Sequence, residues 1–433
     1  MDQEKFVSAQ KAFELGKGEI QLRGWIKRKR EISDTIFVLL RDSTNEIQCV
    51  IEKGKVNEEQ WNSVKKAGIE SSIELKGFLS EDKRAPNGFE LKVQELNVVG
   101  LSENFPISKD LSEEFLLDVR HLWLRSTKMT AINKIRSTVL YAVRDYYRKI
   151  GWFETSPAII TSNACEGGTT LFEFNYFGEK KFLSQSAQMY QEVLIFSLEK
   201  VWGLTPSFRA EKSKTARHLT EYWHLEGEAA WKKMEDMMKV IEGMVEFVCE
   251  AVARENKKEL ELLGRKPEEL NAIKAPFTRI SYDDALDVLS SKYKKKMRWG
   301  SDLSIKEEKL LGQDEKIPFF IFGYPTEIKA FYVKEVPEDP KKCFSFDLIA
   351  PEGFGEICTG GQREDVIENM VKKLKKDKIP LKNYEWYLDL RRYGSVPHSG
   401  FGLGIERLLR WICRQESIKD VIPFPRTINR SYP

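Results

Sequence analysis

The sequence predicts an α+β protein with two domains, a small N-terminal five-stranded β-barrel and a larger domain of strands and helices. Three observations lead to this prediction. The chain has 433 residues, which exceeds the usual size of a single domain. Its N-terminal part contains five short strand-like runs and one helix-like run. After a stretch of low hydrophobicity, helical and extended segments follow one another to the C-terminus.

The composition is that of a globular protein. Hydrophobic residues make up 41% and charged residues 32% of the chain, which is enough apolar material for a large core. The net charge is only +3, so a nucleic-acid partner must be argued from local basic patches. The six cysteines are far apart and form no CxxC pair, which favours a reducing compartment. With no long apolar run, we expect a cytoplasmic protein without a membrane partner.

The barrel is predicted from residues 1–103. Between Ile20 and Val99 the strand-like runs are separated by polar turns and by one helical segment, NEEQWNSVKKAG. A five-stranded barrel of about this length is the expected shape of an oligonucleotide-binding (OB) fold. Such folds present aromatic and basic side chains to unpaired bases.

The candidate base-binding side chains of the barrel are Arg28, Arg30 and Phe37. They combine positive charge for a phosphate backbone with an aromatic ring on which a base can stack. A second interpretation stays open. In it, Phe37 belongs to the core, and the KRKR run at 27–30 is a solvated edge strand.

Residues 104–125 are predicted to link the two domains, and residues 126–433 to form the second domain. The stretch GLSENFPISKD is less hydrophobic than its surroundings and contains Pro106. Helical spacing in the second domain is strongest in three segments, 126–150, 187–200 and 232–263. The segment 264–316 reads as an irregular insertion with its own helices, and no role is assigned to it.

A charged hairpin is predicted from residues 203–211 and 219–230, which contain most of the stretch FRAEKSKTARHLTEYWHLEGE. Side chains two apart in a strand share a face, so Arg209 and Glu211 lie on the same side of the first strand. The second strand has a polar face made of Tyr222, His224, Glu226 and Glu228.

The loop of this hairpin carries four basic side chains, Lys212, Lys214, Arg217 and His218. Such a group suits a polyphosphate better than a fixed structural ion pair. The alternative is a surface hairpin with alternating salt bridges.

Two later segments add carboxylates, glycines and arginines. FSFDLIAPEGFGEICTGGQRED contains Asp347 and Glu356, which are hard oxygen ligands, and then Arg363. HSGFGLGIERLLRWIC runs from a glycine-rich strand into an amphipathic helix with Arg407 near its start. Its GFGLG run lacks the GxGxxG spacing of a dinucleotide site. Carboxylates next to phosphate-binding arginines imply Mg²⁺.

Three features of the sequence, in chain order, resemble the motifs of class II aminoacyl-tRNA synthetases. Pro157 matches the end of motif 1, FRAE at 208–211 the start of motif 2, and GLGIER at 402–407 motif 3. The wording of four further stretches, HLTEYWHLEGE, GEICTGGQRE, RRYGSVPHSGFGLG and IPFPR, is similar to the aspartyl/asparaginyl subclass and, within it, to asparaginyl-tRNA synthetases. The resemblance spans nearly the whole chain.

The resemblance implies a fold and an activity. The second domain would be a catalytic antiparallel sheet flanked by helices, and the N-terminal OB fold would bind the anticodon. The expected activity is ATP-dependent ligation of asparagine to tRNA(Asn) through an asparaginyl-adenylate, with Mg²⁺ on the phosphates. The enzyme would be a homodimer whose interface uses the motif 1 helix and strand.

The resemblance also assigns the nucleotide site. Arg209 would hold the α-phosphate, and Arg407 would cover the adenine ring and reach the γ-phosphate, which makes these two the catalytic residues. The ATP-binding set it implies is Arg209, Glu211, Arg217, His218, Tyr222, Glu356 and Arg407. The metal-binding set is Asp347, Glu356 and Thr359.

For the amino acid, the resemblance implies that Glu166 and Gln188 accept the ammonium group, and that Tyr332 borders the same pocket. Arg363 would hold the side-chain amide oxygen, and the Glu226 carboxylate would accept from the amide NH2.

The choice of asparagine over aspartate depends on two positions. Gln191 stands where aspartyl enzymes carry a lysine, and Glu226 stands where they usually carry aspartate. An aspartate substrate would bring a second carboxylate to Glu226, so repulsion would exclude it. The alternatives are that Gln191 is a helix-surface residue and that Glu226 is structural.

In the barrel, the resemblance implies that Phe37 stacks on the central anticodon base, with Arg30 and Gln48 nearby. Two other functions stay open at this point. One is a relaxed-specificity aspartyl-tRNA synthetase, and the other is a synthetase-like RNA-binding protein that has lost catalysis.

Overall fold

The computed structural model describes residues 5–107, 111–165, 171–211 and 217–433. Contacts divide the chain into two compact units, Met1–Leu116 and Leu117–Pro433. Each unit has a hydrophobic core of its own. Within the described ranges, no helix combines the length and the apolar character needed to cross a bilayer.

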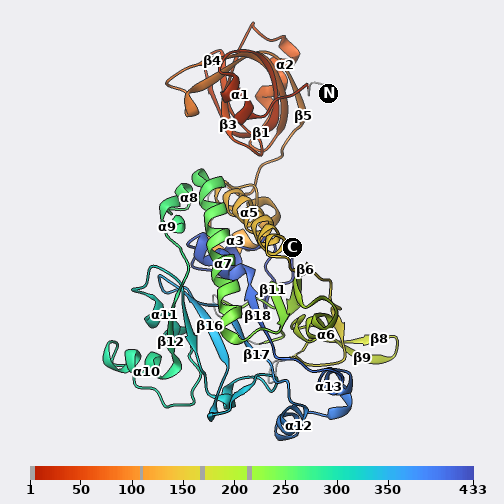
Figure 1. The fold of residues 1–433 in the computed structure, drawn as a ribbon. Coiled ribbons are helices and arrows are strands. Elements are labelled where there is room, and N and C mark those ends of the chain that lie inside the picture. The colour runs from red at the N-terminus through yellow and green to blue at the C-terminus, as the bar shows by residue number, and fades with distance from the viewer. Residues whose placement is uncertain (1–4, 108–110, 166–170, 212–216) are drawn as a thin grey trace. The chain divides into compact units, whose positions relative to one another are not determined.

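The first unit is a closed barrel with the strand order β1-β2-β3-β5-β4 (Figure 1). Its strands are β1 (Gly18–Ile32), β2 (Thr35–Arg41), β3 (Glu46–Glu52), β4 (Ser72–Glu81) and β5 (Phe89–Gly100). Alternate residues of each strand face inward, as Ile36, Val38 and Leu40 do on β2, where each is at most 1% exposed. The predicted five-stranded OB fold is confirmed.

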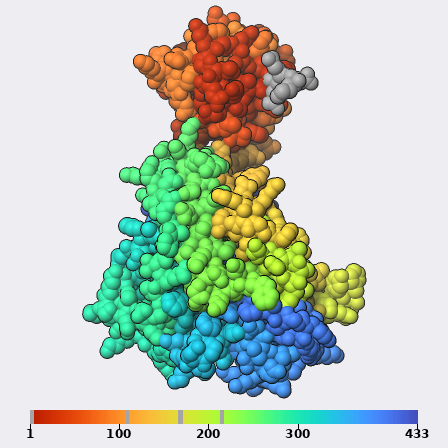
Figure 2. All heavy atoms as spheres, in the orientation of Figure 1, coloured from red at the N-terminus to blue at the C-terminus, as the bar shows by residue number. Residues whose placement is uncertain are grey.

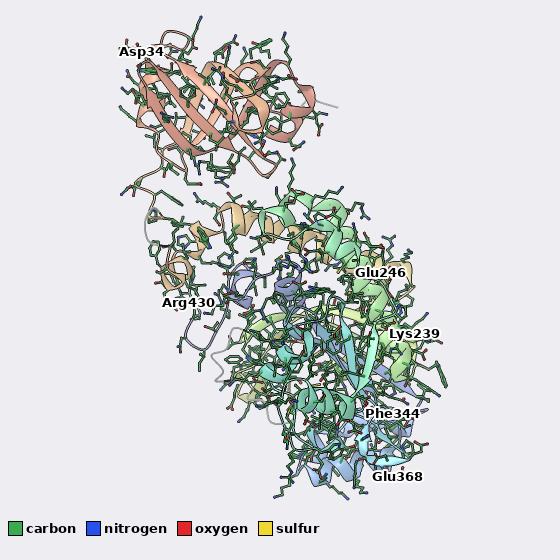
Figure 3. The ribbon with its side chains drawn as sticks, turned by 90° about the vertical axis from the view of Figure 1, so that its left-hand side faces the viewer. Asp34, Lys239, Glu246, Phe344, Glu368 and Arg430 are labelled. Carbon is green, nitrogen blue, oxygen red and sulfur yellow. The ribbon has the colours of Figure 1, made fainter. Side chains whose placement is uncertain are left out.

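The barrel unit also contains two short helices and one point at which two strands approach closely. The helices are α1 (Ala9–Leu15) and α2 (Glu58–Lys66). Asn57 caps α2, and the Gln60 side chain returns a bond to its backbone. At Gly77 of β4, a Cβ atom would lie 2.1 Å from the Lys92 carbonyl oxygen, so only glycine lets the two strands approach there. Figure 3 shows Asp34 at the turn between β1 and β2.

The segment predicted as a linker, 104–125, contains two short helices. They are α3 (Glu113–Asp118) and α4 (Arg120–Trp123). Arg120 is 2% exposed, and its guanidinium donates to the carbonyl oxygens of Lys419 (2.8 Å), Ile422 (2.9 Å) and Pro423 (2.9 Å). The last part of this segment is therefore packed within the second unit. Residues 108–110 lie outside the described residues.

The second unit is built on an eight-stranded sheet with the order β12-β13-β16-β17-β18-β11-β10-β6. Only the two edge strands pair in parallel, β12 with β13 and β6 with β10; the six central strands pair antiparallel. The bounds are β6 Phe153–Glu154, β10 Lys200–Phe208, β11 Glu221–Ala230, β12 Thr278–Ser281, β13 Phe319–Phe322, β16 Ser345–Ala350, β17 Gly355–Gln362 and β18 His398–Gly404. The predicted α+β class is confirmed, with a sheet that is antiparallel at its centre and parallel at its two edges.

Two long helices pack side by side on this sheet, α5 (Thr127–Lys149) and α7 (Met234–Glu255) (Figure 1). Their apolar stripes share one core with Leu225 of β11 and with the last helix of the chain, α14 (Ile405–Ile412). Figure 3 shows Lys239 and Glu246 along the outer side of α7.

Smaller elements surround the sheet. The helices are α6 Gln188–Leu198, α8 Lys257–Leu262, α9 Pro267–Asn271, α10 Tyr282–Ser291, α11 Ile305–Gly312, α12 Ile367–Lys376 and α13 Glu385–Arg392, with 3-10 turns at Pro86–Gly88, Thr326–Ile328, Leu381–Tyr384 and Ile418–Asp420. The short strands are β7 Ile160–Thr161, β8 Glu173–Tyr176, β9 Glu179–Leu183, β14 Glu335–Val336 and β15 Asp339–Cys343. The β8–β9 hairpin projects from the surface (Figure 2), and Phe177 at its tip is 93% exposed.

The segment 264–316, predicted as an insertion without a role, takes part in the main architecture. It contributes the edge strand β12 to the sheet. Its helix α11 packs beside β16 and β17, the strands that carry the predicted metal ligands.

Arg120 provides a test of how the start of the second unit is held. Arg120→Met keeps the length of the side chain but leaves three carbonyl oxygens without their donor, so we expect a loss of about 3 kcal/mol in the free energy of unfolding. Calorimetry of the second unit's transition measures this loss. The control is Arg148→Met, at an exposed position of α5. Equal transition temperatures for the two variants would show that the three hydrogen bonds of Arg120 do not stabilise the second unit.

Candidate active site

A cavity of about 230 Å³ lies at one face of the sheet. Side chains from the β10–β11 hairpin, β16, β17 and α14 line it. It brings together all the residues predicted to bind ATP or metal: Arg209, Glu211, Arg217, His218, Tyr222, Asp347, Glu356, Thr359 and Arg407. The loop lysines Lys212 and Lys214 lie outside the described residues.

The local fold explains this convergence. Strands β10 and β11 pair so that Ser207 lies opposite Tyr222, which puts Arg209 just beyond the end of the ladder. The Arg209 guanidinium lies 5.6 Å from the centre of the Tyr222 ring. Arg407 reaches the same cavity because α14 begins directly after β18, so the first turn of the helix faces the hairpin. A surface hairpin with alternating salt bridges is therefore excluded.

The charged side chains of this cavity form ion pairs. Arg217 donates to Glu308 at 2.6 Å and to the Glu356 carbonyl oxygen at 2.9 Å. Arg407 pairs with Glu356 at 2.7 Å, and Lys329 pairs with Asp347 at 3.0 Å. Burial opposes the ionisation of Glu356, but Arg407 and Arg217 outweigh it and lower its pKa to about 2.

Sequence reasoning missed two of these charged residues, Glu308 and Lys329. Glu308 comes from α11, in the segment to which no role was assigned, and Lys329 follows a 3-10 turn. Burial, together with the charge of Glu356, raises the pKa of Glu308. Neither residue lies in a motif. Only the folded structure shows that each of them contacts charged residues of this cavity.

The predicted metal ligands lie on neighbouring strands. Asp347 of β16 is opposite Thr359 of β17, and Glu356 is on the same strand as Thr359. In the described part of the chain, no three His, Cys, Asp or Glu side chains gather in a position to hold a metal ion. Two carboxylates and a hydroxyl nevertheless suit Mg²⁺, which usually keeps several waters and takes its remaining ligands from substrate phosphates.

A second cavity of about 590 Å³ adjoins the first. It contains four of the five residues predicted to bind the amino acid, namely Gln188, Glu226, Tyr332 and Arg363. The fifth, Glu166, lies outside the described residues. Four residues line both cavities: His224, Lys329, Thr359 and Gly402. A ligand in one cavity can therefore react with a ligand in the other.

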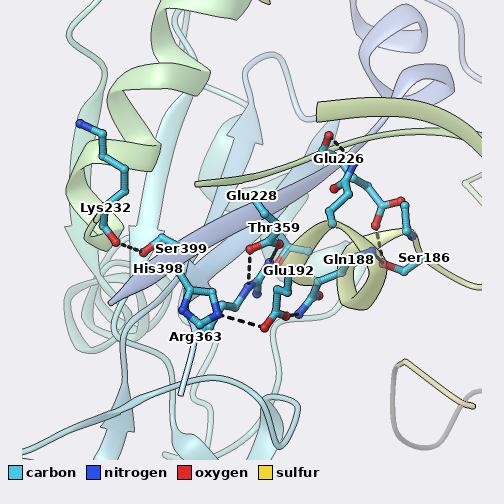
Figure 4. A network of polar contacts seen from close by, with 12 residues as sticks. Ser186, Gln188, Glu192, Glu226, Glu228, Lys232, Thr359, Arg363, His398 and Ser399 are labelled. Atoms are coloured by element: carbon cyan, nitrogen blue, oxygen red, sulfur yellow. Dashed lines mark hydrogen bonds and ion pairs between the residues drawn. The ribbon is translucent and has the colours of Figure 1, made fainter. Parts of the chain in front are cut away.

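Hydrogen bonds from the start of α6 and the residues before it hold Glu226 in place. Its carboxylate accepts from the Ser186 hydroxyl and from the Ala187 backbone N–H at 2.7 Å (Figure 4). Gln191, which is fully buried, donates to the Glu226 carbonyl oxygen at 3.3 Å. The alternative that Gln191 is a helix-surface residue is therefore wrong. Its side chain supports the strand that carries Glu226.

Arg363 is fixed by a residue that the prediction left out of the site, Glu228. The guanidinium makes two bonds to this carboxylate, one of them at 3.2 Å (Figure 4). Its carbon lies 5.3 Å from the centre of the Tyr332 ring. Burial and the nearby charge of Glu192 raise the pKa of Glu228, and Arg363 opposes that shift. The sequence held a signal for Glu228, because it shares a strand face with Glu226.

A buried network centred on Glu192 orients Gln188. Gln188 Nε2 donates to Glu192 at 2.9 Å, one helical turn away. The same carboxylate lies 3.0 Å from His398 Nε2 (Figure 4). It also accepts from Arg391 at 2.8 Å and from the Tyr387 hydroxyl at 2.7 Å. Glu192 is 0% exposed, so these partners compensate for its lost hydration.

The barrel unit has a surface cavity of its own, of about 490 Å³. The three predicted anticodon-binding residues, Arg30, Phe37 and Gln48, line it together with Arg28 and Lys29. Phe37 is half-buried and faces this cavity, so the alternative that it belongs to the core is wrong.

His224 lies where the two cavities meet, and it is neutral. Its Nδ1 is 3.2 Å from the Ser207 hydroxyl and 3.4 Å from the Glu226 carboxylate. Burial, with the charges of Arg209 and Arg407, lowers the pKa of His224 to about 3.

This shift predicts a pH-dependent stability. Because the folded pKa is about 3 and the ordinary value is 6.5, the unfolded chain takes up a proton in that interval and the native one does not. The His224 contribution is intact above about pH 7 and is lost as the pH falls, by about 2 kcal/mol at pH 5. We expect His224→Gln to flatten the fall in transition temperature between pH 7 and pH 5. The exposed His121→Gln is the control, and equal slopes would contradict the prediction.

Comparisons with known proteins agree with this geometry. The family model of class II tRNA synthetases (D, K and N) matches residues 112–428, and that of the OB-fold nucleic acid binding domain matches residues 20–99. The chain is 49% identical to the asparagine–tRNA ligase of Thermococcus kodakarensis, over 96% of both chains. It is 47% identical to that of Pyrococcus furiosus, over 99% of this chain and 100% of the other.

Among solved structures, the asparaginyl-tRNA synthetase of Pyrococcus horikoshii complexed with asparaginyl-adenylate superposes with a TM-score of 0.96. The alignment covers 100% of both chains at 46% sequence identity. The predicted resemblance is thus confirmed by sequence and by fold. The chain belongs to the family of class II tRNA synthetases for aspartate, lysine and asparagine.

Proposed function

We propose that this protein ligates asparagine to tRNA(Asn) in an ATP-dependent reaction that passes through an asparaginyl-adenylate. The observation that carries the proposal is the pair Glu226 and Arg363 in a cavity that adjoins an arginine-rich one. A carboxylate and a guanidinium that line one cavity offer acceptors and donors to the same ligand, which is the complement of a carboxamide. The relatives named above support the same activity.

The first step needs alignment more than proton transfer. The α-carboxylate of asparagine, already ionised, attacks the α-phosphorus of ATP in line, and pyrophosphate leaves. Arg209 neutralises the α-phosphate, while Arg217 and Arg407 hold the outer phosphates. A neutral His224 at the junction suits this chemistry, because it adds no charge next to the nucleophile.

The second step transfers the asparaginyl group to RNA. A ribose hydroxyl at the 3′ end of tRNA attacks the carbonyl carbon of the adenylate, an ester forms, and AMP leaves with the electrons of the broken C–O bond. The hydroxyl proton passes to the solvent, which balances the charge of the departing AMP.

Mg²⁺ fits the carboxylates of the nucleotide cavity. Asp347, Glu356 and Thr359 would hold it, and when bound it would neutralise charge on the phosphates. Three acidic side chains line this cavity, Asp347, Glu356 and Glu308, and a cation between them and the substrate phosphates would reduce their mutual repulsion.

Selectivity for asparagine comes from Glu226. The amide NH2 of asparagine can donate to this carboxylate, while Arg363 donates to the amide oxygen. Aspartate would put a second negative charge there, and a site of this kind can discriminate by roughly 10⁴ to 10⁵. Gln188, with Glu166, would accept the substrate ammonium.

The barrel cavity supports a role in anticodon binding. Phe37 offers a ring for base stacking, and Arg30 and Gln48 offer donors beside it. We also propose a homodimer through α5 and β6. Strand β6 is an edge of the sheet, and two large apolar side chains there, Tyr141 (69%) and Phe153 (54%), are exposed in the single chain.

The cytoplasm is the expected location. All six cysteines are buried and none forms a disulfide, which is typical of a reducing compartment.

Pyrophosphate exchange tests the proposed function. We expect exchange with asparagine and much less with aspartate. In Glu226→Gln, kcat/KM for asparagine should fall about a hundredfold, since a charged hydrogen-bond acceptor is lost, with little change in the KM for ATP.

The matched control is Glu221→Gln, at an exposed position of the same strand. Equal exchange with aspartate in the unmodified protein would support a relaxed aspartyl enzyme, and no exchange would support a non-catalytic RNA-binding protein. Unchanged kcat/KM in Glu226→Gln would remove this residue from amino-acid selection.

Phe37→Ala tests the barrel. Loss of one stacking contact should raise the KM for tRNA about tenfold and leave pyrophosphate exchange unaltered. Aminoacylation kinetics measure both parameters. Phe78→Ala, on β4 of the same barrel, is the control, and an equal effect of both variants would argue for general destabilisation of the barrel.

A further inference from the structure

The nucleotide cavity neutralises its own charges in three pairs. These are Arg217 with Glu308 (2.6 Å), Arg407 with Glu356 (2.7 Å) and Lys329 with Asp347 (3.0 Å). All six side chains line this cavity. The three cations carry the charge that a triphosphate would attract, and the three carboxylates carry the charge that a metal ion would attract. Without a ligand, these two sets of side chains therefore neutralise each other.

The Arg217–Glu308 pair is built into the fold. Its side chains are 4% and 11% exposed, and Glu308 also accepts from the Glu356 backbone N–H at 2.8 Å. The pair presses against Gly355, where a Cβ atom would lie 2.6 Å from the Arg217 guanidinium and 2.7 Å from the Glu308 carboxylate. A side chain at Gly355, whose φ of +77° also favours glycine, would force the pair apart.

The Lys329–Asp347 pair is equally specific. Lys329 Nζ lies within 3.2 Å of both Asp347 oxygens and 3.9 Å from the centre of the Tyr324 ring. Lys329 lines both the nucleotide cavity and the amino-acid cavity. The Lys329 ammonium is thus paired with the carboxylate that a divalent cation would otherwise bind.

We propose that Glu308 and Lys329 make the binding of triphosphate and of divalent cation depend on each other. In the free protein Glu308 neutralises Arg217, and Lys329 neutralises Asp347. When ATP and the cation bind together, both pairs exchange partners. The inference rests on the proposed function, because ATP is the triphosphate in question.

The physical reason is the cost of buried unpaired charge. A triphosphate that binds alone takes the arginines and leaves Glu308, Glu356 and Asp347 next to it as like charges. A divalent cation that binds alone at Asp347 and Glu356 takes the carboxylates that neutralise Lys329 and Arg407. When both bind, the phosphates neutralise the cationic side chains and the divalent ion neutralises the carboxylates, so each ligand raises the affinity of the other by the same factor.

Glu308→Gln tests one side of this exchange. Because the variant removes the carboxylate that competes for Arg217, we expect ATP in the presence of EDTA to bind about tenfold more tightly, a gain of about 1.4 kcal/mol. The further gain in affinity on adding Mg²⁺ should shrink by a similar factor. Isothermal calorimetry of the full chain measures both affinities, and the exposed Glu315→Gln is the matched control.

Lys329→Met tests the other side without any nucleotide. With the competing ammonium removed, Mn²⁺ should bind the free protein about tenfold more tightly, as measured by electron paramagnetic resonance of the unbound ion. Lys316→Met, at an exposed position, is the control. This variant also keeps the proposal testable if Glu308→Gln does not fold.

The outcomes separate two failures. A purely structural role for either residue predicts weaker binding. A lower or unchanged affinity in both folded variants would therefore overturn the exchange. ATP binding by the unmodified protein would still uphold the proposed function. If the unmodified protein binds no ATP with or without Mg²⁺, both conclusions fall. Equal affinity for ATP with and without Mg²⁺ in the unmodified protein also overturns the exchange.

Discussion

The architecture of the site depends on one steric constraint, the row of alternate glycines in β18. Gly400, Gly402 and Gly404 face the polar side of β11, and the ladder sets Glu228 opposite Gly400 and Glu226 opposite Gly402. A Cβ atom on Gly400 would lie 1.8 Å from the Glu228 carboxylate, and one on Gly402 would lie 2.5 Å from His224 Nε2. Because this face of β18 has no side chains at these three positions, the centre of the sheet has room for two carboxylates, an imidazole and a substrate.

The same constraint explains how the buried carboxylates on the polar face of β11 remain stable. The Glu228 side chain of β11 lies over Gly400 of β18 and reaches Arg363, whose two bonds to this carboxylate compensate for burial. The opposite side of β11 carries Leu225 into the core beneath α5 and α7. One strand therefore joins the largest apolar cluster to the polar cavities, and its period of two residues keeps the two environments apart.

Much of this could be predicted from local pattern. The period of the second hairpin strand gave Tyr222, His224 and Glu226 a common face, and the ordered motifs led to the family. Contacts between remote segments could not be predicted. Glu308 meets Arg217 across 91 positions of the chain, and Arg120 meets its carbonyl partners across about three hundred, so neither leaves a periodic trace. The helices in the predicted linker were missed for that reason, because their stability comes from tertiary contacts and not from helix propensity.

The hydrogen bonds that hold the side chains of the amino-acid cavity affect how this cavity accepts its ligand. Gln188, Arg363 and Glu226 each have a partner that fixes the rotamer before any ligand arrives. The conformational entropy of these side chains is therefore lost when the chain folds, and not when the ligand binds. Side chains fixed in this way cannot move to make room. A homologue of the substrate that is one methylene longer would therefore not fit this cavity.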